Sequence, residues 1–197
     1  MKTIGITGGS GAGKSTVTAV WARLGASVLD ADVVYKEVLA DVPELREELS
    51  ARFGAIFQDG VLDRRKLADI VFHDEKALYD LNEITHKYVV DEMRNRLRAE
   101  REKGTAMCMM DAIYLLESEL ACLCQWTVAV ACPTEKRIAR VMERDGLDEK
   151  QAWQRIKNQK SDEYYFENCD IVIENSGDLD ALARDAATLY ERLEKEI

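Results

Sequence analysis

Apolar residues follow two patterns along this chain. In some segments they form short uninterrupted runs, and in the longer segments between them they recur every three or four positions. The runs are typical of strands that are buried on both faces, whereas the recurring pattern is typical of helices with one apolar face. Their alternation predicts an α/β fold, in which a parallel sheet is wrapped by helices. The five predicted strands are residues 2–7, 26–30, 106–111, 126–131 and 170–174.

The segment between the second and third predicted strands is too long for a simple crossover. Residues 33–103 have a mostly helical pattern, in which Asp63 and Asp74 are suited to cap helix N-termini. Within it, Gln58-Asp59-Gly60 is typical of a turn. We therefore expect a helical insertion here.

A second excursion follows the fourth predicted strand, at about residues 134–165. Gly146 is suited to end a helix, and Asp148 with Gln151 forms a variant of the capping box that begins one. We expect a helix, a turn and a second helix here, and a closing helix over residues 179–194. A chain of 197 residues is long enough to bury one sizeable core. We predict a single domain whose core comprises residues 1–32, 104–133 and 166–197.

A glycine-rich segment lies between the first predicted strand and a helical pattern over residues 15–24. Its glycines allow successive backbone N–H groups to turn toward a polyphosphate, Lys14 is placed to reach the outer phosphates, and the Ser15 hydroxyl is placed to bind Mg²⁺. A glycine-rich turn that matched by chance would not be expected to have both the strand and the helix beside it. We predict that a nucleoside triphosphate binds at Gly8, Gly9, Ser10, Gly11, Ala12, Gly13, Lys14, Ser15 and Thr16.

Two carboxylates close the second predicted strand, in the sequence Asp30-Ala31-Asp32. In an open parallel sheet the carboxyl ends of the strands line the ligand crevice, so we expect Asp32 to face the glycine-rich loop. Phosphoryl transfer to an alcohol needs a base for the hydroxyl proton, which makes Asp32 the candidate general base. The alternative is that Asp32 only caps a helix beginning at Val33, and the two roles are compatible.

The third predicted strand also ends in a carboxylate, Asp111. In phosphate-loop enzymes a carboxylate in this place holds Mg²⁺, either directly or through water. The alternative is an ordinary aspartate at the end of a strand. Glu117, which follows Tyr114-Leu115-Leu116, is expected to bind either the phosphate acceptor or solvent.

Three arginines, Arg137, Arg140 and Arg144, are spaced so that they share one face of the helix expected from Thr134. The guanidinium group suits phosphate geometry, and the transferring phosphoryl group needs a cation close by. We therefore predict that this stripe contacts the nucleotide. The alternative is a solvated face that is paired with Glu143 and neighbouring carboxylates.

Two further polar residues are candidates for ligand contact. His86 lies in the helical insertion, where it either contacts the acceptor or is structural or exposed. Asn175 follows the last predicted strand, where it lies beside an adenine base or serves as a turn residue.

The charge balance argues against some partners. The net charge of -10 and the sequence pI of about 4.8 would repel nucleic acid and anionic membranes. The five cysteines are an odd number without Cys-x-x-Cys spacing, which supports neither a disulfide framework nor a zinc site. The sequence has no apolar run near the roughly 18 residues of a membrane span, and its first strand begins without a leader. We expect a cytoplasmic protein, and the oligomeric state is left open.

Taken together, these segments resemble the dephospho-CoA kinase family over essentially the whole chain. Members of this family complete coenzyme A synthesis by phosphorylating the ribose 3′-hydroxyl of dephospho-CoA with ATP. The glycine-rich loop alone would indicate only a nucleotide binder, whereas Asp30-Ala31-Asp32 and the segment from Asp170 to Asn175 discriminate between families. The matching segments are Ile4 to Gly9 with Gly13-Lys14-Ser15, Asp30-Ala31-Asp32, Leu67 to Phe72, Leu81 to His86, Leu115-Leu116-Glu117, Arg137 with Arg140 and Arg144, Arg155 with Gln159, and Asp170 to Asn175.

The resemblance implies roles for the residues in these segments. Gly11 to Thr16 would bind the phosphates of ATP, Asp32 would act on the acceptor hydroxyl, and Arg140 would belong to a mobile lid over residues 134–165. It also implies a five-stranded parallel core of the phosphate-loop NTPase type, Mg²⁺ as cofactor, and a CoA side formed by residues 33–103. The residues that it implicates in binding dephospho-CoA are Asp32, His86, Leu115, Leu116 and Glu117.

Three positions depart from the usual pattern of the family. Lys87 stands where a proline usually follows the histidine, and Tyr114 stands where a proline usually opens Pro-Leu-Leu-Phe-Glu, whose Phe is also missing. Thr134 or Glu135 stands where a glutamine usually precedes the first lid arginine. These departures affect the acceptor side more than the ATP side.

Two alternative functions share the nucleotide-binding features. Another small-molecule kinase with a phosphate loop, such as a nucleoside monophosphate kinase, would differ only in its acceptor. A nucleotide switch of the GTPase type would need an Asn-Lys-x-Asp signature after an apolar strand, and the sequence lacks one.

Overall fold

The computed structural model describes residues 1–196, which fall into two compact units. The first unit comprises Met1–Leu29 together with the chain from Leu97 onward, and the second comprises Asp30–Arg96. The first carries the central sheet and the glycine-rich loop. The second is almost entirely helical.

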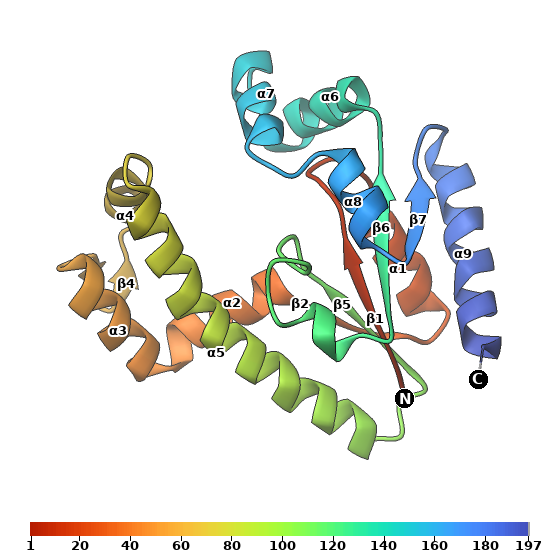
Figure 1. Cartoon of the computed structure of the whole chain (residues 1–197), viewed down its shortest axis with the longest axis horizontal. Coiled ribbons are helices and arrows are strands. Elements are labelled where there is room, and N and C mark those ends of the chain that lie inside the picture. The colour runs from red at the N-terminus through yellow and green to blue at the C-terminus, as the bar shows by residue number, and fades with distance from the viewer. Residues whose placement is uncertain (197) are drawn as a thin grey trace. The chain divides into compact units, whose positions relative to one another are not determined.

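The first unit is built on a five-stranded sheet in the order β2-β5-β1-β6-β7 (Figure 1). This confirms the predicted α/β fold with a parallel sheet. β1 lies between β5 and β6, with Ile4 opposite Met109 on one side and Trp126 on the other, and all three strands run parallel. The strand bounds agree with the predicted ones to within one residue: β1 (Lys2–Thr7), β2 (Ser27–Asp30), β5 (Met107–Asp111), β6 (Trp126–Ala131) and β7 (Ile171–Glu174).

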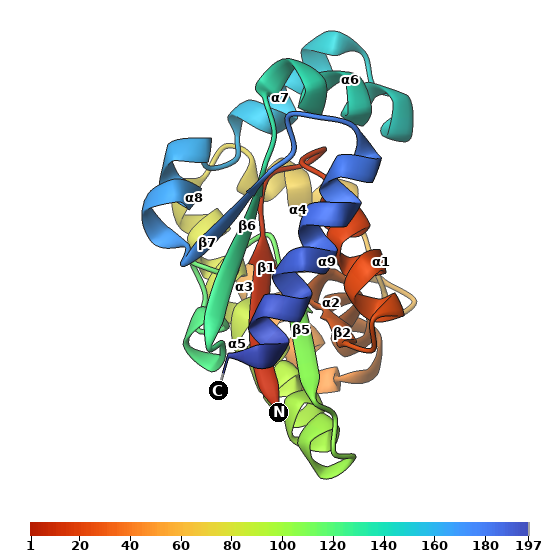
Figure 2. The ribbon, with the colours of Figure 1, turned by 90° about the vertical axis from the view of Figure 1, so that its right-hand side faces the viewer.

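One face of the sheet packs against two helices, α1 (Lys14–Arg23) and α9 (Leu179–Lys195), which lie side by side in Figure 2. Alternate residues of β1, Ile4 and Ile6, are fully buried on this face, as the two-residue period of a strand requires. The Trp21 indole N–H donates to the Ala186 carbonyl over 2.8 Å. Both helices are therefore held to each other as well as to the sheet.

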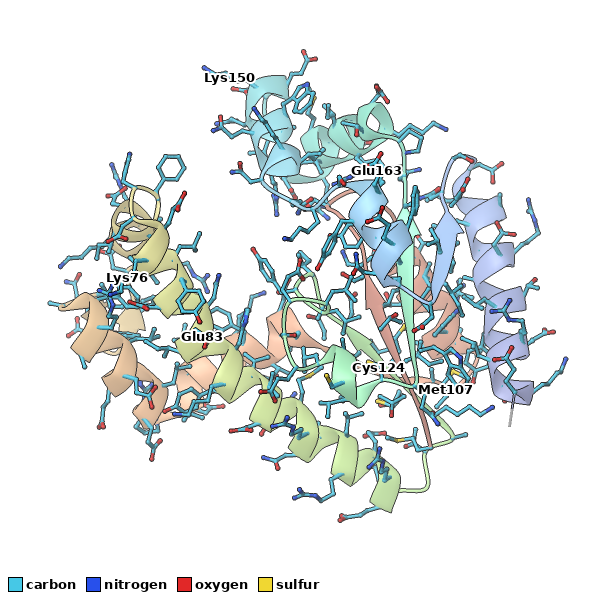
Figure 3. All side chains as sticks on the ribbon, in the orientation of Figure 1. Lys76, Glu83, Met107, Cys124, Lys150 and Glu163 are labelled. Atoms are coloured by element: carbon cyan, nitrogen blue, oxygen red, sulfur yellow. The ribbon has the colours of Figure 1, made fainter. Side chains whose placement is uncertain are left out.

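The opposite face of the sheet is covered by the segment that follows β5. A Cβ atom at Gly5 would lie 2.5 Å from Leu115 Cδ2 and 2.8 Å from Cys124 Sγ, so these side chains pack directly on the glycine. The Thr7 hydroxyl donates to the Ile113 carbonyl over 3.1 Å. In Figure 3 the labelled Cys124 and Met107 lie within the unit, whereas Lys150 lies on α7, away from the sheet.

The excursion after β6 contains α6 (Thr134–Asp145) and α7 (Glu149–Lys157). Gly146 ends α6 in the left-handed conformation, with φ of 65°, and Asp148 with Gln151 forms the capping box of α7. Both caps were predicted. A short third helix, α8 (Asp162–Asn168), completes the excursion and packs on β6 and β7, an element that the predicted hairpin did not include.

The two ends of the first unit are joined at one point. The Lys2 ammonium, at the start of β1, donates to the Leu193 carbonyl over 2.6 Å and to the Glu194 carbonyl over 2.8 Å. A cation is favourable there because the last carbonyls of a helix carry partial negative charge. The first strand is thus tied to the last turn of α9.

The second unit contains α2 (Ala31–Asp41), α3 (Pro43–Phe53), α4 (Arg64–Val71) and most of α5 (Glu75–Glu102), which continues into the first unit. Asp63 caps α4 through the Lys66 N–H, and the Asp74 side chain accepts from the Ala77 N–H, as predicted.

The predicted turn at residues 58–60 proves to be the tip of a small hairpin between β3 (Phe57–Gln58) and β4 (Val61–Leu62). Asp59 and Gly60 have φ of 51° and 78°, which matches the twist of a two-residue hairpin turn. Each strand has only two residues, and such short segments carry no detectable period in the sequence.

Charged side chains connect the helices of the second unit. Arg52 on α3 pairs with Asp80 on α5 over 2.6 Å, and Glu48 accepts from both Lys87 and Tyr88 over 2.9 and 2.8 Å. Among the described residues, no helix is both long enough and apolar enough to cross a membrane.

Candidate functional site

The glycine-rich loop connects the end of β1 to the start of α1. Three of its glycines, at positions 8, 11 and 13, have φ of 138°, 77° and 110°, which residues with a side chain rarely adopt. Gly13 is the N-cap of α1, whose first turn contains no acidic residue and no side-chain cap. The positive end of the helix dipole therefore faces the loop without a neutralising carboxylate from the helix itself.

Glycine is also needed in the loop because other parts of the unit pack against it. A Cβ atom at Gly9 would lie 1.9 Å from Arg137 Nη2, and one at Gly11 would lie 2.7 Å from the Arg137 carbonyl oxygen. Contacts below 3.0 Å require something to move. The backbone of the loop is therefore in direct contact with α6.

Lys14 and Ser15 open α1, as the motif requires. The Lys14 ammonium donates to the Gly8 carbonyl over 2.8 Å, so its side chain spans the loop from end to end. Ser15 is exposed in the first turn of the helix. These positions fit the predicted binding of phosphates by the Lys14 ammonium and of Mg²⁺ by the Ser15 hydroxyl, which stay predictions.

Arg137 braces the loop from within the protein. Its side chain is 3% exposed and uses all three nitrogen positions: Nε donates to the Ser10 carbonyl over 3.1 Å, Nη1 to Asp162 Oδ1 over 3.3 Å and Nη2 to Gln159 Oε1 over 3.0 Å. Burial raises the pKa of Asp162, and the nearby guanidinium opposes that rise. The first arginine of the predicted stripe thus fixes the conformation of the loop.

The other two arginines of the stripe differ from Arg137 and from each other. Arg140 is half-buried and donates through Nη1 to the Gly11 carbonyl over 3.1 Å and through Nη2 to Asn175 Oδ1 over 3.4 Å. Arg144 is exposed and donates to both carboxylate oxygens of Asp145 over 2.8 Å. Arg140 therefore reaches the loop, whereas Arg144 pairs at the solvated end of α6.

Asn175 supports the loop from the end of β7. It is 1% exposed, its Nδ2 donates to the Ala12 carbonyl over 2.7 Å, and its backbone N–H donates to the Ala131 carbonyl over 2.7 Å. A Cβ atom at Gly13 would lie 2.5 Å from the same Nδ2. The amide therefore holds the loop in place, and its predicted contact with the adenine base stays a prediction.

Asp111 stands at the carboxyl end of β5, opposite Ile6 of β1. The next residue, Ala112, continues the pairing by donating to the Ile6 carbonyl over 3.1 Å. Hydroxyl and carboxylate oxygens are hard donors that suit Mg²⁺, and this ion commonly takes only one or two protein ligands beside phosphate oxygens. Among the described residues, no three or more His, Cys, Asp or Glu side chains are grouped so that they could hold a metal ion.

The acceptor residues predicted after β5 have different surroundings. Leu115 is fully buried under the sheet, Leu116 is half-buried, and Glu117 is exposed. Partial desolvation raises the pKa of the Glu117 carboxyl, and Lys160 acts in the opposite direction. Leu115 thus has a packing role, and a contact of these residues with an acceptor stays a prediction.

The second unit carries Asp32 and His86. The helix α2 begins at Ala31, and its N-cap is Asp30, whose Oδ1 accepts from the N–H groups of Asp32 and Val33 over 2.8 and 3.1 Å. The alternative in which Asp32 caps a helix from Val33 is therefore wrong. Because Asp30 supplies the cap, the Asp32 carboxylate is not required for it. Burial lowers the pKa of the His86 imidazole, and Glu83 opposes this shift.

Residues 2–181 match the family model described as dephospho-CoA kinase. The chain belongs to the dephospho-CoA kinase family. A dephospho-CoA kinase from Corynebacterium diphtheriae is 37% identical to it over 199 residues, which cover 100% of both chains.

Solved structures are similar to this chain in fold. The crystal structure of TT1252 from Thermus thermophilus has 33% identity, a TM-score of 0.80, and coverage of 98% of this chain and 97% of its own. A dephospho-CoA kinase from Campylobacter jejuni has 20% identity and a TM-score of 0.63, with coverage of 99% and 98%, and supports the fold.

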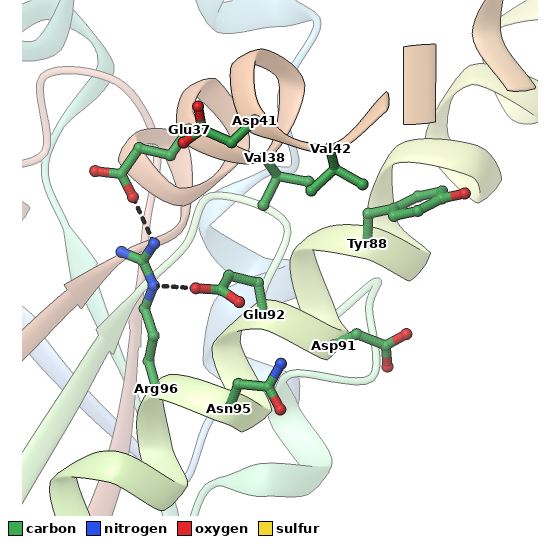
Figure 4. Close-up of a pocket in the computed structure, with 9 residues that line it drawn as sticks. All are labelled: Glu37, Val38, Asp41, Val42, Tyr88, Asp91, Glu92, Asn95 and Arg96. Atoms are coloured by element: carbon green, nitrogen blue, oxygen red, sulfur yellow. Dashed lines mark hydrogen bonds and ion pairs between the residues drawn. The ribbon is translucent and has the colours of Figure 1, made fainter. Parts of the chain in front are cut away.

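A groove of about 280 Å³ in the second unit lies between α2 and α5 (Figure 4). Arg96 crosses it and pairs with Glu37 over 2.5 Å and with Glu92 over 2.8 Å, which joins the two helices. Its lining carries four carboxylates against one guanidinium, a balance that disfavours the anionic substrates of a dephospho-CoA kinase. The groove is lined by Glu37, Val38, Asp41, Val42, Tyr88, Asp91, Glu92, Asn95 and Arg96.

Proposed function

We propose that this chain transfers the γ-phosphoryl group of ATP to the ribose 3′-hydroxyl of dephospho-CoA, which yields coenzyme A and ADP. The observation that carries the proposal is the match of residues 2–181 to the dephospho-CoA kinase family. The dephospho-CoA kinase from Corynebacterium diphtheriae, which aligns along its full length, adds to it. The braced loop supplies the nucleotide side of this reaction.

On the nucleotide side, residues 8–16 would bind the phosphates of ATP, while the Ser10 N–H, which donates to Gln159, would fix the loop. In a loose transition state, negative charge is spread over the oxygens of the transferring group. Lys14 and Arg140 both contact loop carbonyls, and their cationic groups would stabilise that charge. Arg137, Arg144 and Asn175 complete the set of residues that we propose to act on the nucleotide, Arg137 and Asn175 by fixing the loop.

Mg²⁺ would be held by the Ser15 hydroxyl and the Asp111 carboxylate, directly or through water. When bound, the ion would supply positive charge that offsets the negative charge of the phosphates. Both oxygens belong to regular elements of the first unit, the first turn of α1 and the last residue of β5.

On the acceptor side, Asp32 would accept or orient the proton of the 3′-hydroxyl. His86, Leu115, Leu116 and Glu117 are proposed contacts for dephospho-CoA, and residues 33–103 are proposed to form its binding side. Because burial lowers the pKa of His86, its imidazole would be neutral at pH 7 and able to donate one hydrogen bond and accept another. We propose that the reaction takes place in the cytoplasm and that residues 134–165 act as a lid.

The proposal is tested by measuring ATP consumption with four acceptors supplied separately. These are dephospho-CoA, shikimate, a nucleoside monophosphate and pantothenate. We expect turnover with dephospho-CoA alone, and the product should carry a 3′-phosphate by mass spectrometry and phosphorus NMR. Turnover of another acceptor without turnover of dephospho-CoA would overturn the proposal, and so would hydrolysis that is independent of any acceptor.

A further inference from the structure

Gln159 lies in the short connection between α7 and α8, and its side chain contacts the glycine-rich loop. Gln159 Oε1 accepts from the Ser10 backbone N–H over 2.9 Å, and Nε2 donates to Ser10 Oγ over 2.8 Å. The same Oε1 accepts from Arg137 Nη2 over 3.0 Å. The side-chain amide of Gln159 therefore connects the segment after α7 to the glycine-rich loop and to α6.

The three bonds use both groups of the side-chain amide. A carbonyl oxygen has two lone pairs and accepts both the Ser10 N–H and the Arg137 N–H, while the adjacent NH₂ group donates to the hydroxyl. Glutamate offers no donor, and methionine offers neither group, although its length and volume are similar. Ser10 is 6% exposed and Arg137 is also buried, so a polar group that lost its partner here would be left with little access to water.

Ser10 is the point at which these contacts meet. Its carbonyl accepts from Arg137 Nε, its N–H donates to Gln159, and its hydroxyl accepts from Gln159. Both backbone groups and the side chain of one loop residue are thus fixed by residues of the excursion. The excursion, in turn, is the segment that we propose to be the lid.

We propose that Gln159 is a positioning residue for nucleotide binding, which fixes the backbone of Ser10 and thereby couples residues 134–165 to the phosphate loop. The inference rests on the proposed function in taking ATP as the nucleotide. Gln159 acts through Ser10 and Arg137 and needs no contact with ATP itself. A loop that is fixed before ATP arrives loses less conformational freedom on binding, which is the source of the affinity gain.

The first test compares Q159M with a control, Q154M. Gln154 is an exposed residue of α7, so its substitution changes the same residue type on the same excursion without a change at the loop. Calorimetric titration with ATP and with ADP should give dissociation constants that are raised about tenfold in Q159M. Those of Q154M should equal those of the unchanged protein.

The second measurement separates positioning from general stability. Hydrogen exchange of the backbone N–H groups of residues 8–13 should be faster in Q159M, while exchange in α9 and the sheet stays unchanged. The KM for ATP should rise while the KM for dephospho-CoA stays the same. Unchanged affinity for ATP in Q159M would overturn the inference, and so would faster exchange throughout the unit with a matching fall in thermal midpoint, because Gln159 would then be structural only.

A third variant keeps the test decisive if Q159M fails to fold. Q159E retains the acceptor oxygen for Ser10 N–H and Arg137, and the Ser10 hydroxyl can rotate to donate to the carboxylate. Exchange of the loop should then stay close to that of the unchanged protein, and loss of protection in Q159E would contradict the proposal. Titrations with ADP need no phosphate acceptor. If dephospho-CoA were the wrong acceptor, the acceptor assay would show it, and the measured effect of Gln159 on nucleotide affinity would still hold.

Discussion

The glycine-rich loop of the first unit and the helices of the second unit are held together by different kinds of contact. The loop is fixed by buried or half-buried groups, Arg137, Arg140, Asn175 and Gln159, which donate to or accept from its backbone. The second unit buries apolar side chains such as Leu45 and Leu49, and its polar links between helices are ion pairs at the surface. In the pair of Lys87 with Glu48, the side chains are 58% and 41% exposed.

This difference separates two requirements of phosphoryl transfer. Electrostatic stabilisation of a transferring group depends on dipoles that are fixed in advance, and buried hydrogen bonds provide that rigidity. Exposed ion pairs contribute little to stability, because water and salt screen them and long side chains lose entropy. Substitutions of the polar contacts in the two regions should therefore differ in effect.

The largest effect is expected at the acceptor carboxylate. Asp32→Asn should lower kcat by about 100- to 10,000-fold, because it removes the proposed proton acceptor, while the affinity for ATP stays unchanged. The control is Asp30→Asn, since asparagine caps helices as well as aspartate does. Steady-state kinetics with calorimetric ATP titration measures both quantities. If Asp32→Asn lost ATP affinity and kept kcat, Asp32 would belong to the nucleotide or metal site.

The next largest effect is expected at Arg137, which fixes the glycine-rich loop. Arg137→Met should lower the free energy of unfolding by about 2 to 4 kcal/mol, because it leaves the Ser10 carbonyl, Gln159 and Asp162 without their buried donor. The control on the same helix is Arg144→Met, which removes only an exposed pair and should change stability by less than about 1 kcal/mol. Urea denaturation measures both. Equal effects of the two substitutions would remove the distinction between buried and exposed arginines.

A smaller effect is expected for the second unit. Arg52→Met breaks the ion pair between Arg52 and Asp80, whose side chains are 36% and 25% exposed, respectively. The substitution should lower the free energy of unfolding by about 0 to 1 kcal/mol. The same denaturation series gives the value. A loss as large as that of Arg137→Met would show that the second unit is held as rigidly as the loop, and the proposed contrast would be wrong.

The smallest effect concerns pH. Burial lowers the pKa of His86 from its ordinary value of 6.5, so the folded protein binds this proton less readily than the unfolded chain does. The contribution of His86 to stability is therefore full above that ordinary value and declines as the pH falls below it. His86→Gln should flatten the thermal midpoint between pH 7 and pH 5, with His73→Gln, an exposed residue, as control. A steeper dependence in His86→Gln would contradict the sign.

The sheet and the loop were predictable because their signals are local. Continuous apolar runs identify β1 and β6, whose bounds are those expected, and the spacing of Gly8, Gly13 and Lys14 identifies the loop. The caps of α4 and α7 were found for the same reason, since a capping side chain acts within three residues.

The support of the loop was not predictable from such signals. Arg137 and Asn175 contact residues more than 100 positions away in the sequence, and a shared helix face does not show which arginine is buried. Gln159 belongs to a segment that resembles the family, but its contact with Ser10 was not predicted, since a single polar residue in a connection looks like any solvated one. The alternative role of Asp32, as the cap of a helix from Val33, placed the cap two residues too late, because helix starts are uncertain by a residue or two in the sequence.

The central place of β1 has a consequence for how the protein is made. This strand leaves the ribosome before the other strands of its sheet, and its partners on either side, β5 and β6, begin only at Met107 and Trp126. Pairings between segments so distant in the chain form slowly. Until those segments are synthesised, Ile4 and Ile6 cannot be buried in the sheet. The nascent chain would therefore expose an apolar segment until then, and it would benefit from a chaperone that covers this segment.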